Sequence, residues 1–177
     1  MPKKTIFSKD DTFESKRLYF RSVKEGDGEL LFKWRCTPHV YEHARTAQAP
    51  SREEHDRWFA RHMNNIFSVR YIIVEKSSGS ELGVVACDSD DEHCELSYYL
   101  GEPSAQGKGY MKEALVTLFN HLATQYEIGR LMAETRADNL ASIALIEKLG
   151  GVLFDEYSAE NFVWRKYQIP LGKKGGA

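Results

Sequence analysis

The stretch from Cys94 to Asn120, CELSYYLGEPSAQGKGYMKEALVTLFN, constrains the fold of this chain more than any other. It predicts a β-strand over Glu95–Leu100, then a short loop with two glycines, and then an amphipathic helix. One face of that helix carries the apolar residues Leu115, Leu118, Phe119, Leu122 and Tyr126. Because backbone N–H groups at the start of a helix attract anions, we expect an anion site at residues 106–110.

The loop matches neither of two common nucleotide-binding patterns. The P-loop pattern GxxxxGK[ST] is absent, and Gly107-x-Gly109 lacks the third glycine of a dinucleotide-binding loop, since Lys112 stands there. From the residues alone, the glycines either form a phosphate site or serve a turn that needs positive φ or close packing.

Composition describes an ordinary globular protein. The 177 residues predict one domain over 1–177, with loosely held ends at about 1–12 and 172–177. A formal net charge of -2 disfavours nucleic acid as a ligand, and no apolar run reaches the roughly 20 residues that span a bilayer. With no apolar signal segment and an odd number of cysteines, we expect a cytoplasmic protein with reduced thiols.

Hydrophobic periodicity predicts seven strands and four helices. The expected strands are Leu18–Val23, Val69–Glu75, Glu81–Cys87, Glu95–Leu100, Arg130–Thr135, Val152–Tyr157 and Phe162–Pro170. The expected helices are Glu29–Arg35, a helix capped by Ser51 and Glu54 that ends near Asn64, the helix after the glycine loop, and Leu140–Leu149 behind Asn139. Residues 39–50 lack periodicity and predict a loop or broken helix near a binding cleft.

The glycine loop resembles the acetyl-CoA loop of the GNAT superfamily, the GCN5-related N-acetyltransferases. That loop reads [QR]-x-x-G-x-[GA]; Gln106 and Gly109 match it, and Met111 departs from the usual Gly or Ala. The run GKGY followed by Glu113-Ala114 is most similar to the subgroup that acetylates the N-termini of ribosomal proteins.

A second segment resembles the same subgroup. Asn139-x-x-Ser142 and the run 147–150 (EKLG) resemble its fourth-helix signature, although Gly151 stands where the family usually has Phe. The resemblance covers roughly residues 14–170, nearly the whole chain.

The resemblance implies a mixed α/β GNAT fold. Its sheet is central, mixed and mostly antiparallel, with about six or seven strands that splay at the cofactor site and helices on both faces. Acetyl-CoA would be the cosubstrate, with its pyrophosphate on the loop amides. The expected cofactor-binding residues are Tyr98, Tyr99, Leu100, Gln106, Gly107, Lys108, Gly109, Tyr110, Met111, Asn139 and Ser142. Lys108 is equally consistent with a solvated lysine, and Asn139 with a plain N-cap, which is compatible with a cofactor contact.

Acetyl transfer needs a neutral amine. Deprotonation at pH 7 requires roughly 4 kcal/mol for an alkylamine and about 1 kcal/mol for an N-terminal α-amine, so a general base matters most for the first. The resemblance makes Glu95 the candidate base; an exposed strand glutamate and a water chain are the alternatives. Ile146 occupies the position where many relatives carry a tyrosine that acts as the general acid. Ser142 is therefore the candidate proton donor to the leaving thiolate, unless it bonds only to the cofactor or its own helix, with Tyr98 and Tyr110 in reserve.

The acceptor site of this fold lies between the first two helices and the last hairpin. Polar residues expected there are Arg35, His39, Tyr41 and His55. The pattern WRxxP that contains Arg35 resembles enzymes that acetylate nucleotide-linked amino sugars. No metal site is expected, because neither HExxH nor paired-cysteine spacing occurs.

These patterns favour an acetyl-CoA-dependent N-acetyltransferase that acts by direct attack in a ternary complex. The acceptor is a primary amine, either a protein N-terminal α-amine or a small-molecule amine. A nucleotide-linked amino-sugar acetyltransferase is the alternative enzyme. A non-catalytic acyl-CoA-binding sensor, favoured by Ile146 and Met111, is the alternative from another class. The expected partners are acetyl-CoA and the amine, without nucleic acid or membrane, in a monomer or homodimer.

Overall fold

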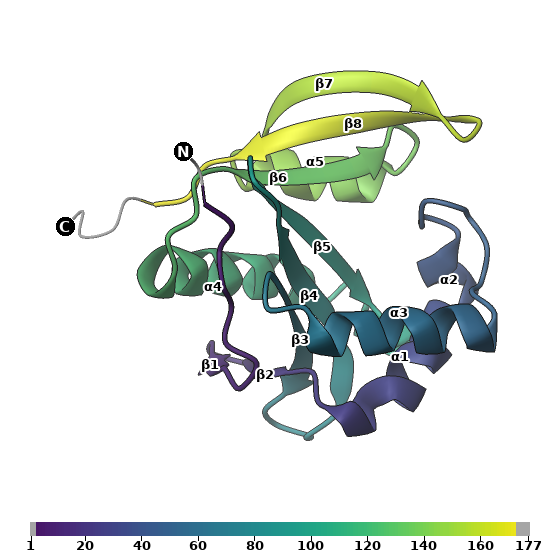
Figure 1. The fold of residues 1–177 in the computed structure, drawn as a ribbon, viewed down its shortest axis with the longest axis vertical. Coiled ribbons are helices and arrows are strands. Elements are labelled where there is room, and N and C mark those ends of the chain that lie inside the picture. Colours follow the sequence, from purple (N-terminus) through teal and green to yellow (C-terminus); the bar gives the residue numbers. More distant parts are fainter. Residues whose placement is uncertain (1–2, 173–177) are drawn as a thin grey trace.

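A single eight-stranded sheet runs through the computed structural model, which describes residues 3–172 (Figure 1). The strand order across the sheet is β1-β2-β3-β4-β5-β6-β8-β7. The strands are β1 Thr12–Glu14, β2 Leu18–Ser22, β3 Ser68–Glu75, β4 Glu81–Ser89, β5 Cys94–Leu100, β6 Leu131–Arg136, β7 Val152–Ala159 and β8 Phe162–Ile169. All neighbours pair antiparallel except β5 and β6, which are parallel.

Helices cover both faces of the sheet, as the resemblance predicts. One face packs against α1 (Gly28–Arg35) and α3 (Arg52–Asn64), with the one-turn α2 (Pro38–Tyr41) between them. The other face packs against α4 (Tyr110–Gln125) and α5 (Leu140–Lys148). Two short 3-10 turns, η1 (Glu25–Asp27) and η2 (Pro103–Ala105), complete the elements. None of the helices within residues 3–172 has the length and apolar character to cross a bilayer.

Strand alternation divides the core between these two faces. On β3, Tyr71 and Ile73 join the cluster under α4 and α5, whereas Ile72 joins the cluster under α1 and α3. On β4, Val85 and Val84 divide in the same way. Central strands that are apolar on both faces account for the continuous hydrophobic runs in the sequence.

The parallel pair is the point where the sheet opens. β5 and β6 pair only through residues 94–96 and 131–133, although β5 continues to Leu100 and β6 to Arg136. Figure 1 shows the two strands diverging beyond that point. The backbone of residues 97–100 therefore pairs with β4 on one side and meets no strand on the other. This confirms the predicted splay.

The N-terminal segment differs from its expectation. Residues 3–11 were expected to be loosely held, but Phe7 is buried and its N–H donates to the Ile66 carbonyl. The Thr5 hydroxyl donates to the Glu127 carbonyl at 2.9 Å. The segment leads into β1, the edge strand that raises the count from the expected six or seven to eight. Its three residues alternate too briefly to give a periodic signal. Of the expected tail at 172–177, residues 173–177 lie outside the described residues.

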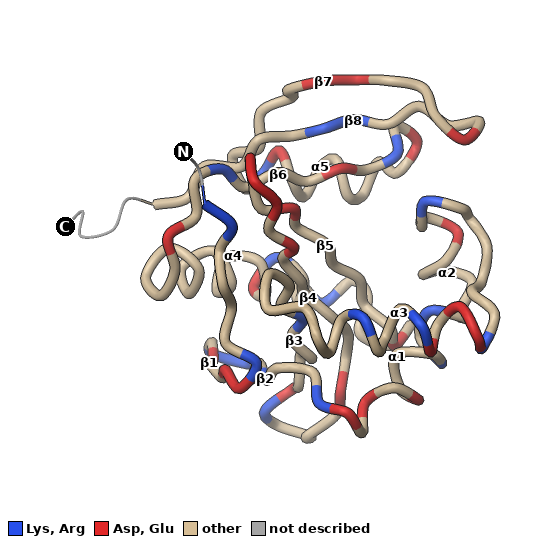
Figure 2. Tube along the Cα trace, viewed as in Figure 1, with Lys and Arg blue, Asp and Glu red and all other residues tan. Residues whose placement is uncertain are grey.

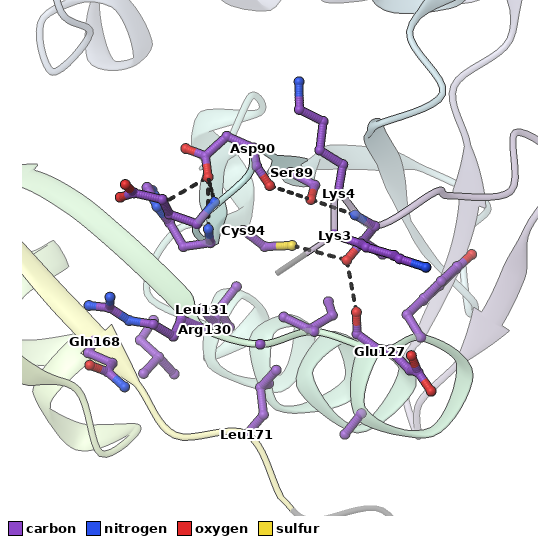
Figure 3. Close-up of a pocket in the computed structure, with 18 of the residues that line it drawn as sticks. Lys3, Lys4, Ser89, Asp90, Cys94, Glu127, Arg130, Leu131, Gln168 and Leu171 are labelled. Atoms are coloured by element: carbon purple, nitrogen blue, oxygen red, sulfur yellow. Dashed lines mark hydrogen bonds and ion pairs between the residues drawn. The ribbon is translucent and has the colours of Figure 1, made fainter. Parts of the chain in front are cut away.

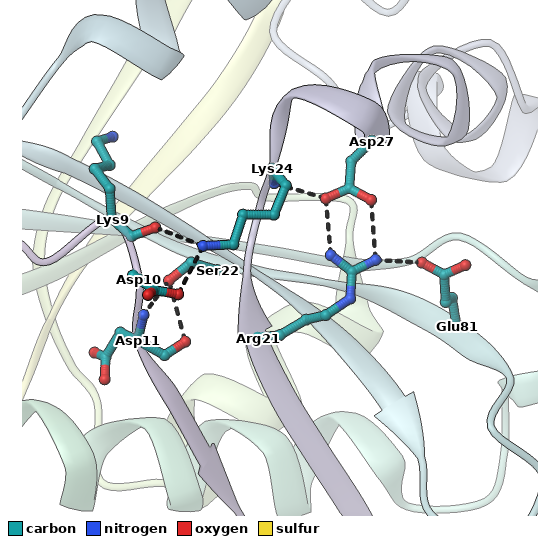
Figure 4. Close-up of polar contacts among 8 residues, drawn as sticks. All are labelled: Lys9, Asp10, Asp11, Arg21, Ser22, Lys24, Asp27 and Glu81. Carbon is teal, nitrogen blue, oxygen red and sulfur yellow. Dashed lines mark hydrogen bonds and ion pairs between the residues drawn. The ribbon is translucent and has the colours of Figure 1, made fainter.

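An ion network fixes the end of β2 (Figure 4). Arg21 donates to both Asp27 oxygens at 2.8 and 2.9 Å and to Glu81 at 2.7 Å, which ties β2 to η1 and to the start of β4. Burial alone would raise the pKa of Asp27, but the bonds from Arg21 and from the Lys24 amide lower it. This network holds the entry to α1.

Candidate active site

The loop before α4 presents a row of free backbone donors. Gly107 and Gly109 adopt φ values of 76° and 74°, a left-handed backbone that favours glycine. In the described part of the chain, the N–H groups of residues 107–112 have no protein acceptor, and the first bonded amide is that of Glu113. A Cβ added to Gly107 would meet nothing within 4 Å, so this side of the loop is open. Free amides at a helix start, with space before them, suit a polyanion such as pyrophosphate.

Arg17 fastens this loop to the sheet. Its Nε lies 2.8 Å from Glu113 Oε1, its Nη1 donates to the Lys108 carbonyl at 3.0 Å, and its guanidinium carbon lies 4.4 Å from the centre of the Tyr110 ring. Glu113 also accepts from the Ser15 hydroxyl and from the Arg17 amide. These contacts bind the loop carbonyl and leave its amides free. Sequence reasoning missed Arg17, because no motif surrounds it.

The other loop side chains have separate places. The Tyr110 hydroxyl donates to Glu75 on β3, so its side chain is turned toward the sheet. Met111 is buried in the core with 9% of its surface exposed, while Gln106 and Lys108 are exposed. The position that departs from the family pattern is thus a core position in this chain. Its backbone amide still belongs to the open row.

Residues 98–100 at the open edge of β5 have side chains on alternate faces. Tyr98 and Leu100 pack toward α4 and α5, and Tyr99 packs toward α1 and α3. The Tyr98 hydroxyl lies 2.7 Å from the Ser142 hydroxyl on α5, and burial raises the pKa of Tyr98. Asn139 caps α5 by accepting from the Ser142 amide at 3.3 Å. The structure therefore brings together Tyr98, Asn139 and Ser142, three of the residues predicted to bind the cofactor.

Two departures from the family pattern, Ile146 on α5 and Gly151 just after it, lie in contact. Ile146, at the position where many relatives carry a tyrosine, is buried with 1% of its surface exposed. A Cβ added to Gly151 would lie 2.5 Å from the Ile146 side chain and 2.8 Å from its carbonyl oxygen. A larger residue at 151 would therefore clash with the last turn of α5.

Glu95 lies on the opposite face of β5 from Tyr98 and beside an acidic partner. It lines a small cavity of about 110 Å³ together with Glu134 of β6. The Glu95 side chain is 50% exposed; its partial burial raises its pKa, the negative charge of Glu134 adds to the rise, and His93 and Lys166 oppose it. Figure 2 shows acidic positions gathered at the start of β5 and the turn before it. A raised pKa is the direction a general base needs. Sequence reasoning missed Glu134, whose register beside Glu95 depends on the parallel pairing.

Glu134 also anchors the loop that follows α2. Arg45 Nη2 lies 2.9 Å from Glu134 Oε1, and its guanidinium carbon lies 4.4 Å from the Trp164 ring centre. The Tyr157 hydroxyl donates to the same carboxylate. The loop from α2 to α3 is therefore tied to the β6–β8 end of the sheet through the carboxylate that also lines the cavity beside Glu95.

The four expected acceptor residues differ in exposure. His55 is buried, with 1% exposed; its Nε2 donates to the Gly28 carbonyl and its Nδ1 accepts from Arg35, and burial lowers its pKa. His55 therefore holds the Arg35 side chain in position through this hydrogen bond. His39 Nε2 donates to the Leu100 carbonyl at 2.8 Å, which joins α2 to the end of β5. Tyr41 is half-buried on α2.

A cavity much larger than the one beside Glu95 lies away from this site (Figure 3). It measures about 1130 Å³ at the far end of α4, between the N-terminal segment, the β4–β5 turn and the residues before β6. None of the loop donors or β5 edge residues lines it. Within residues 3–172, no three His, Cys, Asp or Glu side chains are grouped so that they could hold a metal ion.

The sequence of this chain matches a known protein family. A family model described as the acetyltransferase (GNAT) domain matches residues 17–152. The chain belongs to the GNAT acetyltransferase family. This family membership makes it an N-acetyltransferase by class.

Individual relatives are distant. An N-acetyltransferase 9-like protein from Nematostella vectensis is 25% identical over 143 residues, which are 72% of this chain and 70% of that protein. The ribosomal-protein α-N-acetyltransferase RimL, solved with coenzyme A, superposes with a TM-score of 0.75 at 21% identity, covering 89% of this chain and 97% of that one. A spermidine N-acetyltransferase from Vibrio cholerae, solved with coenzyme A and spermine, gives 0.76 at 15% identity, covering 88% and 96%. At these identities the solved structures establish the fold.

Proposed function

We propose that the protein transfers an acetyl group from acetyl-CoA to a primary amine, the amine being a protein N-terminal α-amine or part of a small molecule. The observation that carries this proposal is the open row of amides at residues 107–112 beside the unpaired edge of β5. The first suits the pyrophosphate of coenzyme A, and the second can hydrogen-bond an extended arm that carries the thioester.

The residues around that edge have distinct roles in the proposal. Glu95 accepts a proton from the incoming ammonium, directly or through water, from the α3 face of β5. Tyr98 and Ser142 supply a proton to the leaving thiolate from the α5 face. The two proton transfers are thus separated, with the amine deprotonated on one face of β5 and the thiolate protonated on the other.

Direct transfer is favoured over an acylated enzyme. Cys87 and Cys94 are buried in the cluster under α4, on the face away from Glu95. Cys36 directs its thiol to the Pro50 carbonyl at 3.8 Å. None of these three thiols lines the cavity beside Glu95, so the amine itself is the nucleophile in a ternary complex.

The experiment measures two quantities on the intact protein. Calorimetry gives the Kd for acetyl-CoA, and a thiol assay gives coenzyme A release across peptides, alkylamines and amino sugars. Tight binding with acceptor-dependent release supports the proposal. Binding without release for any acceptor would assign the chain to non-catalytic acyl-CoA binding, and absence of binding would overturn both.

A further inference from the structure

Two arginines lie against one tryptophan on the α3 side of the sheet. The guanidinium carbons of Arg35 (α1) and Arg70 (β3) lie 4.3 and 4.9 Å from the centre of the Trp58 ring. Tyr99 of β5 is near both: burial raises its pKa to about 12, and the charges of Arg70 and Arg35 oppose that rise. We call these four residues the arginine pocket.

Neither guanidinium has a carboxylate partner among the described residues. Arg35 donates to His55 Nδ1 at 3.1 Å, and the buried Nε of Arg70 has no hydrogen-bond acceptor. Burial, together with Arg70, lowers the pKa of Arg35. The opposite shift, a raised pKa caused by a bound carboxylate, is found at Arg17, Arg21, Arg52, Arg136 and Arg165.

The surrounding groups do not neutralise this charge. Lys9 adds a third cation beside Arg70, and its ammonium donates to the carbonyls of His62 and Ser68. Burial and the charges of Arg70 and Lys9 lower the pKa of His62 to about 3, so that ring is neutral. The nearest acids are engaged elsewhere, Asp88 with the Ser68 hydroxyl and Glu54 with the cap of α3.

Two partly buried guanidinium groups without a counter-ion are unfavourable unless an anion joins them. The planar fork of arginine matches the two oxygens of a carboxylate or phosphate, and the Trp58 ring holds both forks by their faces. The pocket therefore has the chemistry of an anion site. The signal in the sequence was an arginine within the apolar run VRYIIV, on a strand whose neighbours are buried.

The pocket is aligned with the open edge of β5. Arg70 pairs in register with Ala86, and Ala86 with Ser97, so the three share one row on the α3 face. Two strand spacings of about 4.8 Å place the Arg70 backbone roughly 10 Å from Ser97. Glu95 lies two residues before Ser97 on the same face. Glu95 and Arg70 therefore share the α3 face of the sheet but lie in different rows of paired residues.

We propose that the acceptor of this enzyme carries a carboxylate or phosphate several bonds from its reacting amine, and that Arg35 and Arg70 bind that anion against Trp58. The amine end of the inference rests on the proposed function, and the anion end does not. An acidic residue near the N-terminus of a peptide and the phosphate of a small amine both offer this chemistry. A polyamine does not, because it carries only cations.

The test uses two matched pairs of acceptors. One pair is a serine-initiated tetrapeptide amide with aspartate or asparagine at its second position; the other is 6-aminohexyl phosphate and 6-aminohexanol. Calorimetry on the protein saturated with coenzyme A measures binding, and thiol release with acetyl-CoA measures turnover. In at least one pair the anionic member binds about tenfold more tightly than the neutral one, and the pair that responds identifies the source of the anion.

Variants separate the pocket from general surface charge. Arg70→Gln and Arg35→Gln reduce the preference to within about threefold, whereas Arg61→Gln, an exposed arginine on α3, retains it. Thermal unfolding of each variant checks the fold, and either single variant suffices if the other is unfolded. Equal binding within both pairs, or a preference that persists in the folded variants, overturns the inference. Anion-selective binding without turnover would leave the pocket in place and overturn the proposed function instead.

Discussion

The hydroxyl groups of Tyr98 and Ser142 lie 2.7 Å apart and join β5 to α5 across the opening of the sheet. β5 and β6 separate after Leu96, and this bond connects the last part of β5 to the helix that follows β6. Because burial raises the pKa of Tyr98, its proton is retained at neutral pH. The pair can therefore pass one proton from Tyr98 through Ser142 to a group in the opening.

A shared proton path predicts non-additive losses. We expect Ser142→Ala to lower kcat about 30-fold and Tyr98→Phe about tenfold, and the double variant to resemble Ser142→Ala alone. The Kd for acetyl-CoA should change less than about threefold in all three. Steady-state kinetics and calorimetry give these values. Multiplicative losses in the double variant would mean that the two hydroxyls act separately.

Glu95 predicts the acid limb of the pH–rate profile. Its pKa is raised above the ordinary 4.5, so activity should increase as pH rises through that higher value and Glu95 becomes a base. Glu95→Gln should lower kcat/KM about 100-fold and leave only the titration of the amine itself. The exposed neighbour Glu92→Gln is the matched control. An acid limb that survives in Glu95→Gln would remove Glu95 from this role.

The contacts of Arg17 with the loop predict that this residue affects the affinity for acetyl-CoA without touching the cofactor. Arg17→Gln removes the bonds to Glu113 and to the Lys108 carbonyl, so the loop amides should become less ordered. We expect the Kd for acetyl-CoA to rise about tenfold with little change in kcat at saturation. Lys16→Gln, an adjacent exposed lysine, should leave the Kd unchanged. Equal affinities of Arg17→Gln and the parent protein would contradict a role in loop order.

Asp11 predicts how stability depends on acid. Its carboxylate accepts from Tyr71, His121 and Tyr126 at 2.8, 2.7 and 2.9 Å and joins the N-terminal segment to β3 and α4. Burial alone would raise the pKa of Asp11, but these bonds lower it below 3.8. The stabilisation is therefore present above pH ~4 and is lost as pH falls through the lowered value.

Removing that carboxylate should destabilise the fold at neutral pH. Asp11→Asn should reduce the free energy of unfolding by about 1–3 kcal/mol, since three donors lose a charged acceptor. The loss should shrink as the parent protein is acidified. Urea unfolding at pH 7 and at a pH well below 3.8, where Asp11 is protonated, measures both values, and the exposed Asp10→Asn is the control. A constant difference across pH would indicate that the ionised form is not responsible.

The sequence predicted most of the fold because its signals are local. The capping box of Ser51 and Glu54 and the N-cap of Asn139 are side-chain bonds within one helical turn, and both are present. The seven longer strands were visible as β-branched or alternating runs. β1 was not, because three residues carry too little pattern and the pairing with β2 decides the strand.

The candidate site was only partly visible for the same reason. Gly107 and Gly109 adopt the positive φ values that glycine favours, so the glycines themselves indicate the loop in the sequence. Arg17 reaches the loop from about ninety residues away, and the role of Arg70 depends on two helices that meet over β3. Contacts of this kind are set by topology, which a single sequence does not display.

Amide hydrogen exchange with and without acetyl-CoA tests the central claim most directly. The account predicts that acetyl-CoA slows exchange at residues 107–112, the free amides of the loop, and at those amides of residues 97–100 that face the open edge of β5. Slowing at the large cavity around Thr5 and Glu127 instead, or no slowing at the loop under saturating acetyl-CoA, would contradict it.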